Sequence, residues 1–177
     1  MIDIMLGGHS DDLVARLDPR LNAVDTGTGQ ITVDPHVVQL RGPGWSLTVD
    51  PTRFSSVDFD NGLVIAAHVS PQSDYLLLEP TSEIVDRLQR RFVDFGFRPR
   101  LDRTTTGEQL RAAMGEIDAD PSFHREVYRA RRGDIGCSLV MKKTVPKGST
   151  LGRAAGIGSD LYLLTLTAKL LSQDGAF

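Results

Sequence analysis

The residues best suited to chemistry or binding are concentrated between Asp120 and Cys137. This stretch, DPSFHREVYRARRGDIGC, holds four arginines, an Arg-Gly-Asp triplet and the only cysteine of the chain. Clustered guanidinium groups bind phosphates, carboxylates and acidic protein surfaces. We expect Gly133 of the triplet to end a helix, and we therefore assign the triplet no role in cell adhesion.

The same stretch is predicted to form a helix over residues 121–132. Asp120 before Pro121 is typical of an N-cap followed by proline in the first turn, and Gly133 suits the position after the last turn. At about 100° per residue, the apolar residues fall on one side and the arginines on the other. The apolar side comprises Phe123, Val127 and Ala130, and the basic side comprises Arg125, Arg129 and Arg132.

The uniform charge of that basic side allows two interpretations. Like charges four residues apart on a helix repel each other by roughly a few tenths of a kcal/mol, so a face that only meets water is expected to mix Glu with Arg. The face is then either simply solvated or a binding surface for an acidic partner, with nucleic acid a poorer candidate because the chain has a net charge of −3. The residues assigned to the binding surface are Arg125, Tyr128, Arg129, Arg132, Lys142 and Lys143.

Other catalytic or metal-binding patterns are weak. The four histidines have no metal-ligand spacing, and His9 beside Ser10 is not a triad, because triads are assembled from distant segments. The glycine-rich run 152–160 is expected to be a loop, with anion binding by its amides as the alternative. Cys137 is expected to be buried and unreactive. We expect no metal, no cofactor and no catalytic residue, which makes a non-enzymatic protein the preferred reading.

Residues 30–79 consist of short β-rich runs separated by turn residues, which predicts a β-sheet. Asn61-Gly62 predicts a hairpin, because both residues tolerate positive φ. Opening residues 2–6 predict one more strand, and Ser10 predicts the start of a helix through Leu21. The six expected strands are QITVD, HVVQLR, WSLTVD, FSSVDF, GLVIAAHV and DYLLLE.

Helices and further strands are expected to complete this sheet. Residues 81–95 carry one apolar stripe and end before Gly96. A second helix is expected from Thr105, which has capping-box spacing to Glu108. IGCSLVMKKTV reads as a strand, and residues 160–171 read as a strand with a buried helix as the alternative.

Composition and charge limit the class of protein. With 177 residues, 40% hydrophobic and 24% charged, the chain is long enough for a substantial core. Acidic residues outnumber basic ones 14 to 7 in residues 1–97, whereas basic residues lead 12 to 7 in residues 98–153. No apolar run is long enough to cross a membrane, and the acidic start does not resemble a secretion signal, so we expect a cytoplasmic location and no membrane partner.

These observations predict a single α+β domain over residues 1–177. We expect an antiparallel sheet or partial barrel from residues 30–79, three or four helices packed on one face, and carboxy-terminal strands completing it. The expected function is binding of a protein with an acidic surface, as in immunity or antitoxin-type inhibitors that mask a toxin. The alternatives are a small enzyme or ligand-binding protein with a pocket between sheet and helices, and a nucleic-acid-associated regulator.

Overall fold

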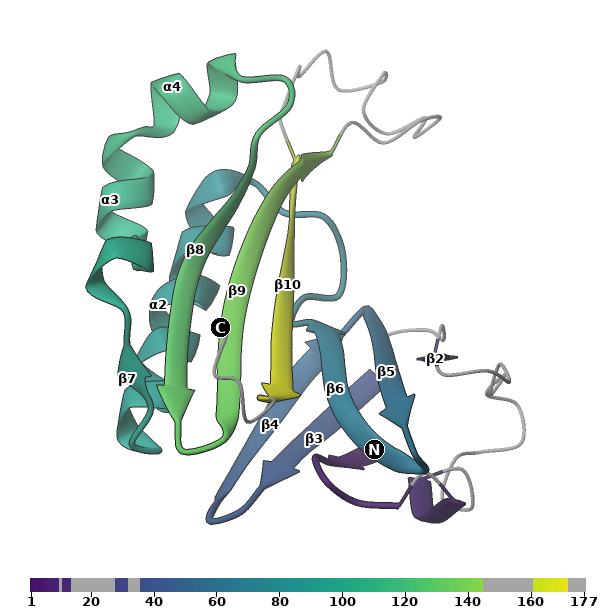
Figure 1. Cartoon of the computed structure of the whole chain (residues 1–177). Coiled ribbons are helices and arrows are strands. Elements are labelled where there is room, and N and C mark those ends of the chain that lie inside the picture. Colours follow the sequence, from purple (N-terminus) through teal and green to yellow (C-terminus); the bar gives the residue numbers. More distant parts are fainter. Residues whose placement is uncertain (10, 14–27, 32–35, 145–160, 172–177) are drawn as a thin grey trace.

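The computed structural model describes residues 1–9, 11–13, 28–31, 36–144 and 161–171 (Figure 1). Residues 11–13 are helical, and the rest of the helix expected up to Leu21 lies outside the described residues, as does the glycine-rich run 152–160. The elements in chain order are β1 (Ile2–Met5), β2 (Thr28–Ile31), β3 (His36–Gly42), β4 (Trp45–Thr52), β5 (Phe54–Asp60), β6 (Leu63–Ser70), α2 (Leu78–Asp94), β7 (Arg98–Pro99), the 3₁₀ helix η1 (Leu101–Arg103), α3 (Gly107–Ala112), α4 (Met114–Ala119), β8 (His124–Arg132), β9 (Ile135–Thr144) and β10 (Leu161–Leu170).

The strands form two sheets. The smaller sheet has the order β1-β3-β4, in which β1 runs parallel to β3 and β3 antiparallel to β4. The larger sheet has the order β2-β5-β6-β10-β9-β8-β7, and its neighbouring strands run antiparallel. The α+β class is therefore confirmed, with mostly antiparallel sheets that are not closed into a barrel.

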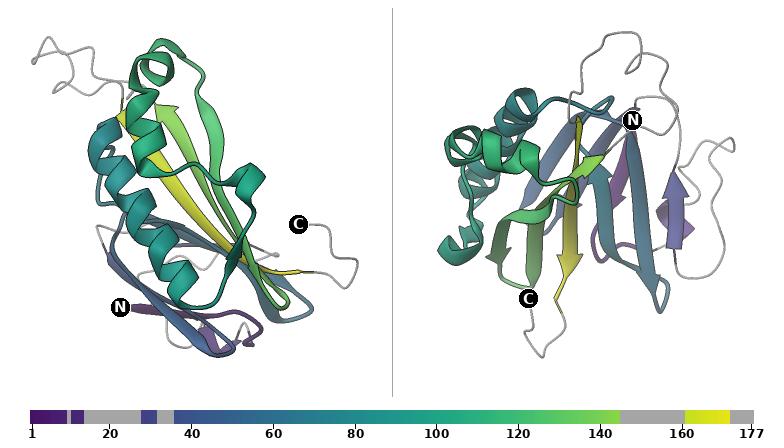
Figure 2. Two further views of the ribbon diagram at one scale, coloured as in Figure 1. Left: turned by 90° about the vertical axis from the view of Figure 1, so that its left-hand side faces the viewer. Right: turned by 90° about the horizontal axis from the view of Figure 1, so that it is seen from above.

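One face of the seven-stranded sheet is covered and the other is open. Helix α2 lies along β8, β9 and β10, with α3 beside it, while β3 and β4 lie behind β5 and β6 (Figures 1 and 2). The described residues place no helix or strand over the opposite face, which looks toward the viewer in Figure 1. We call that opposite face the open face.

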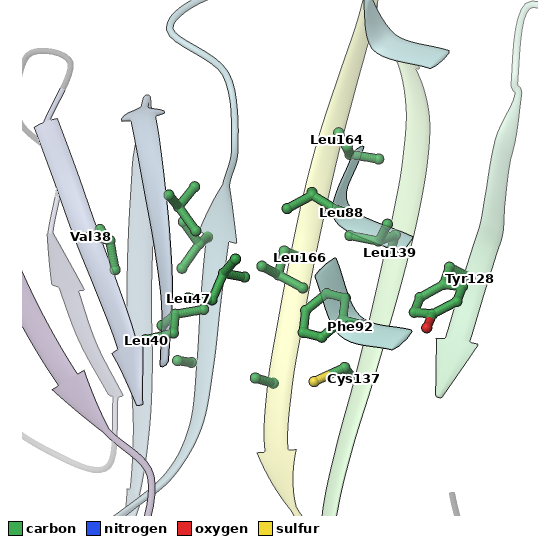
Figure 3. Close-up of a cluster of buried hydrophobic side chains, with 14 of the residues drawn as sticks. Val38, Leu40, Leu47, Leu88, Phe92, Tyr128, Cys137, Leu139, Leu164 and Leu166 are labelled. Carbon is green, nitrogen blue, oxygen red and sulfur yellow. The ribbon is translucent and has the colours of Figure 1, made fainter. Parts of the chain in front are cut away.

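The covered face is sealed by a continuous hydrophobic core. Side chains from both sheets and from α2 belong to one buried cluster (Figure 3). Trp45 of the smaller sheet meets Phe97 edge-to-face at 5.5 Å between ring centroids, and Phe92 of α2 stacks on Tyr128 at 6.0 Å. Aromatic contacts of this kind add to the free energy gained from burial. They attach the smaller sheet to the segment that follows α2, and α2 to β8 of the larger sheet.

The carboxy-terminal strand closes the fold between segments that are distant in sequence. β10 pairs with β9 over ten residues on one side and with β6 on the other. Leu164 and Leu166 point into the core, as expected from the alternation of this segment (Figure 3). The strand prediction for residues 160–171 is confirmed and the helix alternative is wrong.

The helices agree with the predictions in position more than in detail. α2 covers the expected segment, and Gly96 follows it with φ +80°. The second predicted helix is two short helices that meet at Ala113. Its capping box is formed by Thr106 and Gln109, one residue later than predicted.

Four of the six strands predicted in residues 30–79 are present as β3 to β6. Asn61-Gly62 forms the expected turn, with φ of 49° and 74°. β2 overlaps the first predicted strand, and residues 32–35 lie outside the described residues. The sixth prediction is wrong, because Leu76 makes only an isolated bridge to Tyr162 and α2 begins at Leu78. Leucine suits a helix better than a strand, which explains the difference.

The predicted helix over residues 121–132 is also wrong, because this segment contains the strand β8. Asp120 caps a turn instead of a helix, since its carboxylate accepts hydrogen bonds from the amide and hydroxyl of Ser122. Gly133, with φ +55°, occupies the two-residue turn between β8 and β9. The Arg-Gly-Asp triplet therefore lies at a hairpin tip, where Arg132 donates a 2.9 Å hydrogen bond to the carbonyl of Gly44.

An irregularity in β8 explains why its sequence resembles a helix. The register with β9 shifts between Glu126 and Tyr128, so Val127 and Tyr128 are buried one after the other. Such a bulge inserts a residue and interrupts the period-2 alternation of a strand. Phe123, Val127 and Ala130 then acquire a spacing that matches a helix.

Candidate functional site on the open sheet face

The register of the seven-stranded sheet assigns polar residues to the open face. Successive side chains of a strand point to opposite faces, so cross-strand neighbours share a face. On the covered face, Leu166 lies opposite Leu139, which lies opposite Tyr128. On the open face, a polar row crosses five strands in register, formed by Ser56, His68, Thr167, Ser138 and Arg129.

The neighbouring row of the open face alternates charged and small residues. Lys169 of β10 lies between Ala66 of β6 and Gly136 of β9, with Asp58 and Arg131 beyond them. Small side chains on both sides of Lys169 leave a wide, open hollow over the middle of the sheet. This hollow is lined by Asp58, Ala66, His68, Arg129, Ser138, Thr167 and Lys169.

His68 connects two strands through both of its ring nitrogens. Its Nε2 lies 3.0 Å from Oδ2 of Asp58 on β5, and its Nδ1 lies 2.9 Å from Oγ1 of Thr167 on β10. An ionised carboxylate only accepts hydrogen bonds, so Nε2 carries a hydrogen and donates the hydrogen bond to Asp58. In the neutral imidazole Nδ1 then accepts the hydroxyl proton of Thr167, and the three side chains form one directed chain of hydrogen bonds.

Arg129 is held at the edge of the hollow by a carboxylate on its own strand. Its Nε and Nη2 both lie 2.9 Å from Oε1 of Glu126, whose side chain is 15% exposed. Glu126 Oε2 is buried with no hydrogen-bond partner among the described residues. The pairing restricts the guanidinium to one orientation above the sheet.

The open face is basic although the chain as a whole is acidic. On β8, β9 and β10 the described open-face positions carry one acid, Glu126, while the whole chain has a net charge of −3. Like charges gathered on one surface create an electrostatic potential that attracts an oppositely charged partner. On these three strands the open-face cations are Arg129, Arg131, Lys142 and Lys169, and Arg98 of β7 lies opposite Arg131.

The structure separates the six residues predicted to bind a partner. Arg129 and exposed Lys142 lie on the open face. Exposed Arg125 lies opposite Met141, and Arg132 is anchored to the β3–β4 turn through Gly44. The expected arginine stripe is therefore not present.

The remaining two residues are buried and are not available to a partner. Tyr128 is 1% exposed and faces α2, so it cannot contact a partner as predicted. Lys143 is 7% exposed, and its Nζ donates a 2.6 Å hydrogen bond to the carbonyl of Asp118 on α4. Both belong to the interface between the sheet and the helices.

Three further features considered from the sequence were a reactive Cys137, a metal site and a membrane-spanning segment. Cys137 is buried as expected, and burial raises the pKa of its thiol, which keeps it protonated and unreactive. Within the described ranges, no group of three His, Cys, Asp or Glu side chains is placed to hold a metal ion. In the same part of the chain, no helix is long and apolar enough to cross a membrane.

Sequence reasoning missed most of the open-face residues. The sequence distinguishes three of them, Asp58, His68 and Thr167, only as polar residues at alternate positions of apolar strands. That alternation indicates a face exposed on one side. It cannot indicate that β10 lies between β6 and β9, which is the pairing that brings the three side chains together.

Comparisons with protein-family models, with curated proteins and with solved structures gave no match. The geometry of the open face is therefore the basis for a proposed function.

Proposed function

We propose that this protein is a non-enzymatic binding module whose open sheet face docks the acidic surface of a partner protein. Such a module would act in the cytoplasm as an inhibitor or escort, in the manner of immunity or antitoxin proteins that mask a toxin. One observation supports this best: on β8, β9 and β10 the described open-face positions carry four cations, Arg129, Arg131, Lys142 and Lys169, against one acid, on a chain of net charge −3.

The shape of the open face supports the same proposal. The hollow is wide and shallow, and small-molecule sites are usually concave pockets that bury most of their ligand. The layer between sheet and helices, where the alternative function of a small enzyme or ligand-binding protein places its pocket, is packed with side chains such as Leu88, Phe92 and Leu139 (Figure 3). A broad contact with another protein suits this surface better.

A second candidate, a small ligand-binding protein or enzyme, is favoured by one feature. The hydrogen-bonded chain of Asp58, His68 and Thr167 faces the hollow. Binding of small molecules at the open face, without any protein partner, would support that candidate instead.

Site-specific photo-cross-linking in cells tests the proposed function. A benzophenone amino acid at Val140, on the open face between β8 and β10, should capture a protein. The same probe at Val93, which is 52% exposed on α2, is the matched control and should capture none. The captured contact surface should be acidic. When the cross-linking is repeated in a cell extract, the yield should fall as added salt rises, because exposed charges are screened over about 8 Å at physiological ionic strength. Equal capture from both positions, or capture that ignores salt, would contradict the proposal.

A further inference from the structure

We propose that the partner binds the open face through an amphipathic α-helix that lies along β9 and β10, with apolar residues at its middle and acidic residues at both ends. The inference rests on the proposed function, because it names the element by which an acidic partner protein would make the contact. The helix would cover a central strip of the open face. We define this central strip by its four residues, Ser138 and Val140 of β9 and Leu163 and Thr165 of β10.

The central strip carries no charge and offers apolar surface. Each of its four side chains is aliphatic or ends in one hydroxyl group, and each is half-buried. Val140 lies directly opposite Thr165, so their methyl groups are neighbours on the same face. Covering apolar surface that now meets water favours binding, which predicts apolar residues at the middle of the partner helix.

Cations stand at both ends of the central strip. Exposed Lys142 lies at one end, opposite Leu163. At the other end exposed Arg131 lies opposite Gly136, and exposed Arg98 of β7 lies opposite Arg131. The run from Gly136 to Lys142 measures about 20 Å along β9. Acidic residues at both ends of a helix of this length would meet these cations.

A helix suits this face because the sheet offers side chains to a partner and no backbone groups. β9 pairs with β8 and β10, and β10 pairs with β9 and β6, so their backbone groups are directed at neighbouring strands. An extended segment or a loop pressed against the face would bury amide and carbonyl groups without partners, which costs free energy. A helix pairs these groups within itself.

The neighbouring edge of the sheet is occupied where a partner strand would lie beside the cations. β7 pairs with β8 at this edge. The amides of Arg100 and Thr105 donate hydrogen bonds to the carbonyls of Arg129 and Val127 on β8. The segment 98–105 therefore takes the place of an added strand, and the partner is left with the face of the sheet.

The strands already hold a helix in this orientation on their covered face. α2 lies along β8, β9 and β10 (Figure 1), and its 17 residues extend about 25 Å. A helix of about 13 residues spans the distance between Lys142 and Arg131. Its sequence should carry acidic residues about 13 positions apart, with apolar residues every three or four positions between them.

Two synthetic peptides of about 18 residues and identical composition test this surface directly. The first carries glutamates in its first and last turns and leucines at helical spacing between them, and the second carries leucines in the end turns and glutamates in the middle. Added to the ¹⁵N-labelled protein, the first peptide should shift the amide signals of Val140, Thr165 and Lys142 in a saturable way and gain helical circular dichroism. The second should bind at least about tenfold more weakly, because its charges do not meet the end cations.

Substitutions in the protein identify where the first peptide binds. Val140→Gln removes apolar surface from the central strip and Lys142→Gln removes an end cation, and each should weaken binding of the first peptide by about fivefold. Val93→Gln and Arg87→Gln, at exposed positions of α2, are the matched controls and should bind as the wild type does. Because Lys142 is exposed, Lys142→Gln keeps the test valid should Val140→Gln fail to fold.

The outcomes separate the partner helix from the proposed function. Equal affinity of the two peptides, or unchanged binding in Lys142→Gln, would overturn the helix. If cross-linking from the open face captures an acidic protein while the protein does not distinguish the peptides, the proposed function stands and the helix is wrong. If the peptides behave as expected while cross-linking captures no acidic protein, the helix-binding surface stands and the proposed function is wrong.

Discussion

Two tyrosines buried in the seven-stranded sheet differ in what their hydroxyl groups meet. The Tyr162 hydroxyl donates a 2.6 Å hydrogen bond to Oδ1 of Asp118 on α4. The Tyr128 hydroxyl has no hydrogen-bond partner among the described residues. Burial raises the pKa of Tyr128, with nearby Cys137 adding to the shift, so its hydroxyl stays protonated at neutral pH. We therefore expect the hydroxyl of Tyr162, which has a hydrogen-bond partner, to stabilise the fold, and the hydroxyl of Tyr128 to contribute nothing.

The two tyrosines form a matched pair for measurement. Tyr162→Phe should lower the free energy of unfolding by about 1 kcal/mol, because it leaves Asp118 without this donor. Tyr128→Phe should leave the free energy of unfolding unchanged or raise it by about 1 kcal/mol, because it removes a buried polar atom that gains nothing. Urea unfolding monitored by circular dichroism gives both values. Equal destabilisation by the two substitutions would show that the Tyr128 hydroxyl has a partner.

At the scale of elements, α3 is held against α2 by close backbone approach. The amide of Gly107, at the start of α3, donates a 2.6 Å hydrogen bond to Oδ1 of Asp86 on α2. A Cβ atom at Gly107 would lie 2.3 Å from Asp86 Oδ2 and 2.6 Å from the carbonyl oxygen of Ser82. Only glycine fits there without movement of a helix.

Two glycine-to-alanine substitutions test this contact. Gly107→Ala should lower the free energy of unfolding by about 1–3 kcal/mol, because the added methyl group forces the helices apart. Gly115→Ala on α4, where an added Cβ meets open space, should raise the free energy of unfolding by about 0.5–1 kcal/mol through helix propensity. Thermal unfolding of the two variants, compared with the wild type, is the measurement. Stabilisation by both would mean that α3 does not pack on α2 as described.

The elements also show how far local sequence patterns predict this fold. β3 to β6, α2, β9 and β10 were predicted from β-rich runs, an amphipathic helical stripe and turn residues, and they are confirmed. β8 was mistaken for a helix because one bulged residue, Val127, shifts its alternation. The run Leu76 to Leu78 at the start of α2 was mistaken for part of a strand, because a short apolar run has no period that separates a strand from a helix. A local pattern fails where a single inserted residue or a short run removes the period.

For the whole molecule, the separation of charge matters more than the net charge. The sequence predicted basic residues in the second half of the chain, and the structure places four of the cations on one sheet face. The predicted set contained Arg129 and Lys142 of that face. It missed Arg131 and Lys169, because their position depends on the order β6-β10-β9-β8, which joins strands from distant parts of the chain. Pairing of this kind is a property of the assembled sheet and is not carried by any local segment.

Binding of an acidic protein to the open face is measured by the affinity of the cross-linked partner for two charge-reversal variants. One variant carries Arg131→Glu and Lys142→Glu on the open face, and the control carries Arg87→Glu and Arg90→Glu on exposed positions of α2. Both change the net charge equally, so only the location of the charge differs. We predict that the open-face variant loses at least about tenfold in affinity, mainly through slower association, while the control binds within about twofold of the wild type. Equal losses in the two variants, or none in the open-face variant, would contradict the account.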